Sequence, residues 1–304
     1  SSVTGYDAEA DSFGQVMMTD TARNLIRVFF LQSTLKKQGN PIDRKIEHVH
    51  VVGAGVMGGD IAAWCALRGH TVTLQDREQK YIEPALERAG KLFARRVKDD
   101  TKRAATIERL QADVAGDGAA KADLVIEAIL ENLEAKQALY RDLQAKMKPG
   151  ALLATNTSSI RLEELRTVLD APTRFIGLHF FNPVAMMPLL EIAPTEATDD
   201  ATLATAFAVG KALKKTCVWS KDDTAFIVNR LLLRANAGAT ASRDFSLLPP
   251  SVRFFAGGDE SVRGYDYESL GPKDAEGNVI GGTAGAPHDN PLEVFLRIIS
   301  RISR

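Results

Sequence analysis

The chain contains 304 residues, of which 45% are hydrophobic and 25% are charged, a composition typical of a globular protein with one large domain or two modest ones. Its 38 Lys and Arg residues nearly balance its 39 Asp and Glu residues, which leaves a formal net charge of -1. We therefore expect no nucleic acid and no membrane as partners of the main domain, and any anionic ligand has to be bound by local groups.

The two cysteines and the start of the chain bear on its location. Cys65 and Cys217 lie far apart in the sequence and lack the spacing of a metal site, so we expect two buried thiols, no metal and no disulfide framework. The sequence has no run of about 18 apolar residues and starts without a signal peptide. These features predict a cytoplasmic protein whose sequence begins inside a longer chain.

The first predicted element is an amphipathic helix over residues 20–38. Asp20 and Thr21 offer an N-cap, and Gly39 and Pro41 end the helical pattern. We interpret residues 1–45 as a helical connector.

From residue 47 onward, short β-branched runs alternate with stretches of helical periodicity. The predicted strands are residues 48–52, 71–74, 124–126, 152–155 and 175–178, and the predicted helices are residues 60–68, 81–98, 133–147 and 160–169. This alternation is typical of βαβ units, in which helices cover both faces of a parallel sheet. The sequence therefore predicts an α/β fold, with a Rossmann-type doubly wound parallel sheet over residues 46–221.

The pattern changes near the C-terminus. After Asp244 the chain contains the pair Pro249 and Pro250, eight glycines between residues 257 and 285, and little helical periodicity before residue 292. Little of this stretch can pack as a helical domain, so we expect residues 244–304 to form a poorly ordered tail.

A G-x-G-x-x-G motif directly follows the first predicted strand and opens the next helix. Gly53 permits the tight turn, Gly55 lets the backbone approach a pyrophosphate, and Gly58 lets the helix pack on the strand. Val56 and Met57 stand at the helix N-terminus, whose N–H groups face the phosphates. The motif predicts a dinucleotide site with NAD as the cofactor, and a glycine turn without a ligand is the alternative.

Asp76 ends the second predicted strand, 23 residues after Gly53. A carboxylate at this place accepts hydrogen bonds from the adenosine ribose and repels a 2′-phosphate. We therefore expect NAD rather than NADP. A phosphate tolerated by Arg77, or a solvated strand end at Asp76, is the alternative.

His179 stands at the C-terminal end of the strand predicted for residues 175–178, where open α/β sheets place their ligands. Glu191 follows within the apolar run of residues 188–192, and a carboxylate in such company needs a partner. The imidazole of His179 is a suitable one. We interpret the other four histidines as structural.

Five motifs occur in an order and at a spacing that resemble the 3-hydroxyacyl-CoA dehydrogenase family. They are the glycine motif, Glu131–Leu133, Asn156–Ser159, His179–Pro183 and Ile227–Arg230. The resemblance covers residues 46–234. Residues 20–26 also resemble the junction between the hydratase and dehydrogenase parts of the multifunctional α subunit of bacterial fatty acid oxidation complexes.

The resemblance implies NAD-dependent oxidation of an L-3-hydroxyacyl-CoA to a 3-ketoacyl-CoA, a step of fatty acid β-oxidation. His179 is then the general base that takes the 3-hydroxyl proton, and Glu191 fixes its tautomer and stabilises the imidazolium. Ser158 and Asn229 match family residues that hydrogen-bond the reacting oxygen or the thioester region. The resemblance also allows for a thiolase subunit as a partner in the full-length complex.

Four residues match NAD-contacting positions of the family: Glu131, Lys136, Ser158 and Asn182. Several have structural alternatives. Ser158 could cap the helix that begins near residue 160, and Asn229 could be a surface amide. Glu131 could be a helix-start carboxylate and Lys136 a solvated lysine.

The sequence departs from the family pattern in two places. Thr224–Phe226 replaces the family's Pro-Gly-Phe, so a backbone shape that Ala225 resists would displace Asn229 slightly. Residues 222–243 look like the start of the family's helical substrate and dimerisation domain, but the resemblance fades there. Residues 246–282 instead resemble a piece of the outer-membrane Omp85 superfamily, nearest to the autotransporter assembly factor.

Three hypotheses about function remain open at this point. The leading one is an NAD-dependent dehydrogenase whose chain is a fragment joined to foreign sequence. The second is an NAD-binding module that no longer catalyses. The third, an outer-membrane assembly component, is disfavoured by the missing signal peptide.

Overall fold

The computed structural model describes residues 2–37 and 44–230 of the chain. The chain divides into two units, of which the second is Phe29–Asn229. The second unit contains the sheet and every predicted site residue. The predicted tail, residues 244–304, and most of the predicted segment 222–243 lie outside the described residues.

Two helices precede the sheet, α1 (Ser2–Met17) and α2 (Asp20–Lys37). The helix predicted for residues 20–38 is confirmed as α2, whereas α1 was not predicted. The N-cap is Thr19 and not Asp20, because the Oγ1 atom of Thr19 accepts the N–H of Ala22 at 3.2 Å. Among residues 2–37 and 44–230, no helix combines the length and the hydropathy that a membrane span requires.

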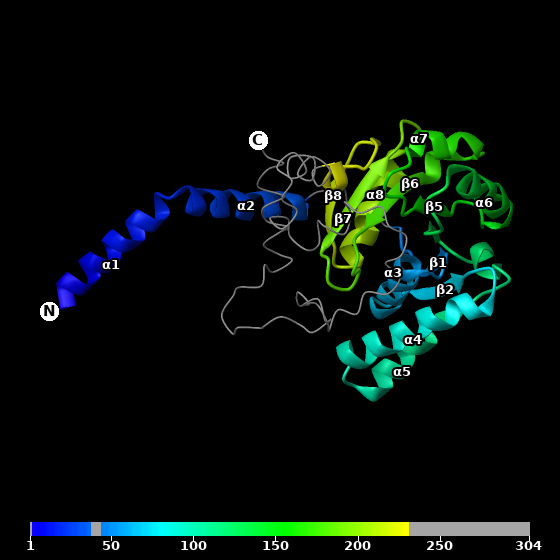
Figure 1. Cartoon of the computed structure of the whole chain (residues 1–304), viewed down its shortest axis with the longest axis horizontal. Helices are drawn as coiled ribbons and strands as arrows, with labels where there is room; N and C mark the ends of the chain where they lie inside the picture. The colour runs from blue at the N-terminus through cyan, green and yellow to red at the C-terminus, as the bar shows by residue number, and fades with distance from the viewer. Residues whose placement is uncertain (1, 38–43, 231–304) are drawn as a thin grey trace, which may run out of the picture. The chain divides into compact units, whose positions relative to one another are not determined.

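The sheet has eight strands in the order β3-β2-β1-β4-β5-β6-β7-β8 (Figure 1). They are β1 (His48–Val52), β2 (Thr71–Gln75), β3 (Leu110–Ala112), β4 (Leu124–Glu127), β5 (Leu152–Thr155), β6 (Phe175–Phe180), β7 (Leu189–Pro194) and β8 (Thr216–Trp219). The five predicted strands are confirmed. The other three were not predicted: β3 and β8 form the two edges of the sheet, and β7 lies between β6 and β8.

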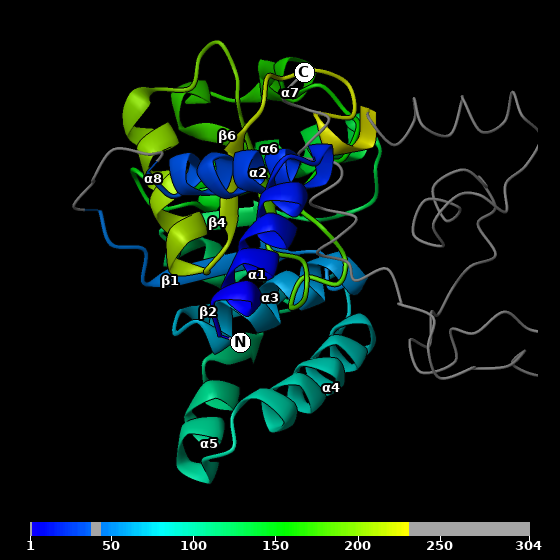
Figure 2. The same ribbon diagram turned by 90° about the vertical axis from the view of Figure 1, so that its left-hand side faces the viewer.

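The helices of this unit are α3 (Val56–Leu67), α4 (Gln79–Arg96), α5 (Asp100–Glu108), α6 (Leu133–Lys146), α7 (Leu162–Leu165) and α8 (Asp200–Ala212). One helix was predicted over residues 160–169, but the structure has two short elements there, α7 and the 3-10 helix η2 (Arg166–Val168). Helices α4 and α5 form a hairpin that projects from the body of the sheet (Figures 1 and 2).

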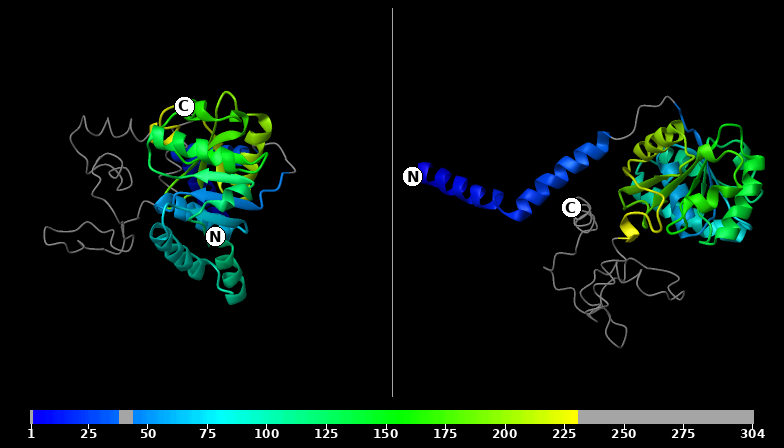
Figure 3. Two further views of the ribbon diagram at one scale, coloured as in Figure 1. Left: turned by 90° about the vertical axis from the view of Figure 1, so that its right-hand side faces the viewer. Right: turned by 90° about the horizontal axis from the view of Figure 1, so that it is seen from above.

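Two apolar clusters cover the two faces of the sheet, as a doubly wound fold requires. Buried residues of α3, α4 and α8 pack on one face, where they meet Val51 and Ile126. Residues of α6 and α7 pack on the other, where they meet Val52 and Val125. The side chains of neighbouring strand residues therefore point to opposite layers, which are visible on both sides of the sheet in Figure 3.

The sheet is mixed rather than wholly parallel, which corrects one detail of the prediction. Strands β1 to β6 are parallel to their neighbours, but β7 runs antiparallel to β6, and β8 is parallel to β7. A parallel partner for β6 would need a crossover of roughly a dozen residues or more. Only residues 181–188 separate β6 from β7, so the chain turns back directly.

The strand order reverses between β1 and β4, and this switch point is where doubly wound sheets bind ligands. Five strands are parallel, so their C-terminal ends lie on the same side of the sheet: β1, β2, β4, β5 and β6. The predicted site residues follow these strands.

Candidate active site

The glycine motif forms a tight turn between β1 and α3. Gly53 has a φ of +104°, and a Cβ atom there would lie 2.5 Å from the carbonyl oxygen of Ala128, so this position requires glycine. A Cβ atom on Gly58 would lie 1.8 Å from the carbonyl oxygen of Gly53. A Cβ atom on Gly55, in contrast, would meet no atom within 4 Å. The turn is closed against the protein at Gly53 and Gly58 and open at Gly55.

The open side of this turn fits the pyrophosphate of a dinucleotide. Helix α3 begins at Val56. Its N-cap is Gly55, which has no side chain to cap the N–H groups of the first turn. The side chain of Val56 is exposed, and Met57 is half-buried. Unpaired N–H groups at a helix N-terminus bind anionic groups well. The residues predicted to hold the phosphates therefore lie together in a suitable geometry.

Asp76 lies beside the glycine turn, at the end of β2. Its Oδ2 atom accepts the N–H of Ala54 at 2.8 Å, and its Oδ1 atom accepts the N–H of Arg77 at 2.7 Å. The carboxylate is thus fixed against the turn rather than free in solvent. An anion held there suits recognition of the ribose hydroxyls.

His179 and Glu191 face each other across β6 and β7. The two residues are register partners, and Nδ1 of His179 lies 2.7 Å from Oε2 of Glu191. Both side chains are buried. Directly opposite residues of an antiparallel pair point to the same face, so the strand pairing brings the two side chains into contact. Within the described part of the chain, Nε2 of His179 has no hydrogen-bond partner.

Two phenyl rings lie next to the imidazole. The ring centroid of Phe181 is 4.5 Å from that of His179, and the centroid of Phe226 is 5.5 Å away. These rings restrict the orientation of the imidazole and exclude water from part of its surface.

The segment after β8 completes the constellation. Oε1 of Glu191 accepts the N–H groups of Ile227 at 3.1 Å and Val228 at 2.9 Å. Next in the chain, Nδ2 of Asn229 donates to the carbonyl oxygen of Ser158 at 3.4 Å. All four residues predicted to act in catalysis, His179, Glu191, Ser158 and Asn229, therefore lie in one connected group.

A family profile described as 3-hydroxyacyl-CoA dehydrogenase, NAD binding domain, matches residues 48–223, which is more than half of the chain. The chain belongs to the 3-hydroxyacyl-CoA dehydrogenase family. A second profile, the Omp85 superfamily domain, matches residues 210–288. The described part of this second match, residues 210–230, contains the end of α8, all of β8 and the segment that contacts Glu191.

Similar proteins carry related names. The fatty acid oxidation complex subunit alpha of Pseudomonas putida is 34% identical over 233 residues, which cover 74% of this chain and 33% of that relative. The chain thus spans about a third of the length of the curated relatives it matches.

Solved structures give the same family. The 3-hydroxybutyryl-CoA dehydrogenase of Escherichia coli K12 is 32% identical with a TM-score of 0.64, covering 68% of this chain and 45% of that one. The (S)-3-hydroxybutyryl-CoA dehydrogenase of Ralstonia eutropha is 31% identical with a TM-score of 0.63, covering 68% of this chain and 75% of that one.

Ala225 stands at the position where the family pattern has a glycine. Ala225 has a φ of +66° and Phe226 a φ of +45°. The backbone therefore does adopt the left-handed shape that alanine resists. Asn229 nevertheless reaches Ser158.

Glu131 ties the loop after β4 to the loop after β5. Its Oε1 atom accepts the hydroxyl of Thr157 at 2.6 Å and the N–H groups of Ser158 at 2.8 Å and Ser159 at 2.9 Å. Burial raises the pKa of this carboxyl, but the Thr157 hydrogen bond, the charge of Lys136 and the Ser158 N–H outweigh it and lower the pKa to about 2. Glu131 is an anion that shapes the Ser158 loop.

A buried polar network lies beneath this loop and was not predicted. Oε1 of Glu127 accepts from Nζ of Lys136 at 2.6 Å, and Oε2 accepts the hydroxyls of Tyr140 and Thr155, each at 2.8 Å. The Lys136 side chain is only 1% exposed, and its Nζ lies 3.4 Å from Oε2 of Glu131. Burial, with the Glu127 charge acting in the same direction, raises the pKa of Tyr140.

The structure decides between several alternatives left open by the sequence. Lys136 is not a solvated lysine, because it is buried between Glu127 and Glu131. Ser158 does not cap α7, since that helix begins at Leu162, and the carboxylate of Asp222 accepts the N–H groups of its first turn. Asn182 is exposed at the end of β6, on the predicted edge.

Two signals would have helped to find the missed residues. Glu127 follows the apolar run Leu124–Ile126. A carboxylate in an apolar run needs a partner, and this reason, which pointed to Glu191, applies equally to Glu127. The contacts of Ile227 and Val228 to Glu191 use backbone N–H groups, which every residue except proline possesses. No residue type marks them in a sequence.

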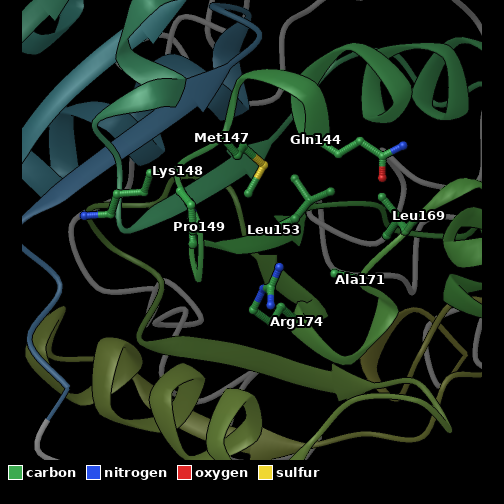
Figure 4. A pocket seen from close by; sticks show the side chains of 9 residues that line it. Gln144, Met147, Lys148, Pro149, Leu153, Leu169, Ala171 and Arg174 are labelled. Atoms are coloured by element: carbon green, nitrogen blue, oxygen red, sulfur yellow. The ribbon is translucent and has the colours of Figure 1, made fainter.

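A separate cavity of about 260 Å³ lies near the N-terminal ends of β5 and β6 (Figure 4). Its lining includes Met147, Leu153, Leu169, Lys148 and Arg174. Arg174 directly precedes β6, whereas the predicted residues follow the strands. This cavity therefore contains none of the predicted site residues.

Proposed function

We propose that this chain oxidises the C3 alcohol of an L-3-hydroxyacyl-CoA to a 3-ketoacyl-CoA with NAD, as part of fatty acid β-oxidation. The observation that carries the proposal is the contact of 2.7 Å between His179 and Glu191 at the edge of a sheet that also presents a dinucleotide turn. Membership of the family and the names of the relatives support the same reaction.

The residues around His179 suit it to act as a general base. Glu191 accepts the proton on Nδ1, so Nε2 offers its lone pair to the 3-hydroxyl proton of the substrate. The positive charge that forms on the imidazole is stabilised by the Glu191 carboxylate. Bound NAD would supply the acceptor for the hydride that leaves C3. Ser158 and Asn229 supply hydrogen-bond donors near the reacting oxygen or the thioester.

The cofactor residues divide into two groups in this proposal. Gly53, Gly55, Val56, Met57 and Gly58 hold the pyrophosphate, and Asp76 binds the adenosine ribose, which favours NAD over NADP. Glu131, Ser158 and Asn182 contact the remaining part of the dinucleotide. Lys136 acts indirectly, since its buried Nζ holds Glu131 in place.

The experiment is a paired measurement on the whole chain. NADH binding is followed by titration, and turnover is followed as loss of NADH absorbance with acetoacetyl-CoA. We expect both for an active dehydrogenase. NADH binding without turnover would instead identify an NAD-binding module that no longer catalyses. This outcome is tested because the chain covers only 33% of the length of its relative. Absence of NADH binding would refute both proposals.

A matched variant tests the cofactor site itself. Gly55→Val places a side chain in the open space of the turn, where a Cβ atom meets nothing within 4 Å. We expect NADH binding to be lost, because the side chain occupies the pyrophosphate space, while the thermal unfolding temperature is unchanged. Unchanged affinity would contradict the assignment of this turn to the cofactor.

We further propose the division of the chain into a connector (1–45), an NAD-binding domain (46–221), the start of a helical domain (222–243) and a foreign tail (244–304). Limited proteolysis with mass analysis tests it, and the expected first cut lies near residue 244. Protection of the tail would refute the division.

The proposed setting is the cytoplasm, with a thiolase subunit as partner of the full-length complex. The name of the relatives, a subunit of a fatty acid oxidation complex, supports the partner, and the two free, buried cysteines suit a reducing compartment. Co-purification of a thiolase with the full-length protein is the test, and a full-length protein that elutes alone would contradict it.

A further inference from the structure

The turn of residues 223–228 holds one oxygen of Glu191. The N–H groups of Ile227 and Val228 both donate to Oε1, at 3.1 and 2.9 Å, whereas Oε2 lies 2.7 Å from Nδ1 of His179. The two oxygens of one carboxylate therefore have separate partners. A rotation that turned the carboxylate away from His179 would break two backbone hydrogen bonds inside the protein, where Glu191 is 1% exposed.

The turn is anchored on both sides of its contact with Glu191. Just before it, the Asp222 carboxylate accepts the N–H groups of Leu162 at 2.7 Å and Glu163 at 2.8 Å. Within it, the N–H of Phe226 donates to the carbonyl oxygen of Asp223 at 3.0 Å. The Phe226 ring is buried against His179. Backbone and ring thus approach the same His-Glu pair together.

The shape of the turn depends on two consecutive left-handed residues. Ala225 has a φ of +66° and Phe226 a φ of +45°. Residues other than glycine resist this region because Cβ approaches the backbone, so the turn contains strain that the surrounding contacts must overcome. A larger or β-branched side chain at Ala225 would shift the backbone that carries the Ile227 and Val228 N–H groups.

We propose that the 223–228 turn is a positioning element for the general base. It fixes the Glu191 carboxylate so that Oε2 faces His179, and this keeps the proton of the neutral imidazole on Nδ1 and leaves Nε2 as the base. Ala225 is the position that controls the turn. The catalytic meaning of this inference rests on the proposed function, but the tautomer is a property of the chain without cofactor or substrate.

The test is the 15N NMR spectrum of the full chain labelled on histidine, recorded where the imidazole is neutral. The His179 signals are assigned with the variant His179→Gln. We expect the wild-type chain to show the Nδ1-protonated tautomer at His179. Ala225→Gly should keep this tautomer and raise the unfolding temperature by a few degrees, because glycine adopts positive φ without strain.

Ala225→Val should shift the turn and increase the Nε2-protonated form of His179 several-fold. Lys214 supplies the matched control, since it also has a positive φ, 54°, but lies exposed after α8. Lys214→Val should lower the unfolding temperature without changing the His179 tautomer. An unchanged tautomer in a folded Ala225→Val chain, or an equal change in Lys214→Val, would overturn the proposal.

A second variant covers the case in which Ala225→Val does not fold. Glu191→Gln removes the charge from the acceptor of the Ile227 and Val228 N–H groups. Their amide protons should move upfield and exchange with solvent about tenfold faster. Amide signals identical to those of the wild-type chain would refute the contact. Since none of these measurements uses NADH, failure of the proposed function is recognised separately by the binding titration.

Discussion

The cofactor half and the catalytic half of the site are built in different ways. The cofactor half, at the ends of β1 and β2, consists mainly of backbone and uses residues close in sequence, such as Gly53 and Gly58. The catalytic half, at the end of β6 and in the turn after β8, consists of buried side chains from distant segments. Ser158 and Asn229, for example, are 71 positions apart.

This difference shows what each half depends on. The shape of the glycine turn is enforced by steric exclusion, since any Cβ atom on Gly58 would overlap the carbonyl oxygen of Gly53. The His179–Glu191 contact exists only because β7 pairs antiparallel with β6 in one register. A shift of that register by one residue would point Glu191 to the opposite face. The catalytic half is therefore the half that tertiary structure controls.

The comparison predicts its largest effect at the catalytic half. His179→Gln should reduce the turnover rate of any chain that turns over by roughly two to four orders of magnitude, because the general base is lost. NADH affinity should be unchanged, since the cofactor half is built independently. Turnover and titration measure the two quantities. His70→Gln is the control, because His70 lies half-buried beside Ile46 at the start of the sheet. A variant that lost rate and NADH affinity together would show that the halves are coupled.

The buried Glu127–Lys136 pair beneath the loops should give the next largest effect. Glu127→Leu leaves the Lys136 ammonium, 1% exposed, without its main partner, and should lower the free energy of unfolding by about 3–5 kcal/mol. Chemical denaturation measures this value. The double variant with Lys136→Met should recover part of the loss, since the unpaired charge is gone, while the Tyr140 and Thr155 hydroxyls still lack their acceptor. A double variant less stable than the single one would contradict this account.

Because Lys215 is buried next to the segment after β6, we expect the stability of the chain to depend on pH in the alkaline range. Its Nζ donates to the carbonyl oxygens of Val184 and Met187, just after the His179 segment. Burial lowers the pKa of this lysine from 10.5 to about 8. The folded chain therefore releases the proton more readily than the unfolded chain, and stability should rise between pH 8 and pH 10.5, by up to about 3 kcal/mol.

Denaturation at several pH values, compared with Lys215→Met, measures this contribution. The variant should lack the rise, and the exposed lysine Lys211, changed to Met, should keep it. An identical pH dependence in wild type and Lys215→Met would show that the buried ammonium makes no difference.

Glu131 should give the smallest effect, in the acid range. Its folded pKa of about 2 lies below the ordinary 4.5, so its contribution to stability is present above pH 4.5 and is lost as the pH falls through 2. Because the side chain is 33% exposed, solvent screening reduces this contribution to about 1–2 kcal/mol. Glu131→Gln should be less stable than wild type at neutral pH, and the difference should shrink on acidification. A constant difference across the range would contradict the assignment.

The sequence by itself determined the parts whose signals are local. The five β-branched runs of β1, β2, β4, β5 and β6 were identified because each is a short apolar run between helical patterns. The glycine motif was identified because the turn geometry excludes other residues. The strands β3, β7 and β8 were missed. The short edge strands β3 and β8 are stabilised by their neighbours more than by their own composition, and the sequence indicated β7 only as an apolar run around Glu191.

Tertiary structure decided the rest. It determined that β7 returns antiparallel, that Lys136 is buried beside Glu127, and that the turn after β8 brings two backbone N–H groups to Glu191. Strand pairing and burial act between residues far apart in the chain, and a backbone N–H is the same in almost every residue. The sequence therefore indicated which side chains could react, and the fold determined how they are held.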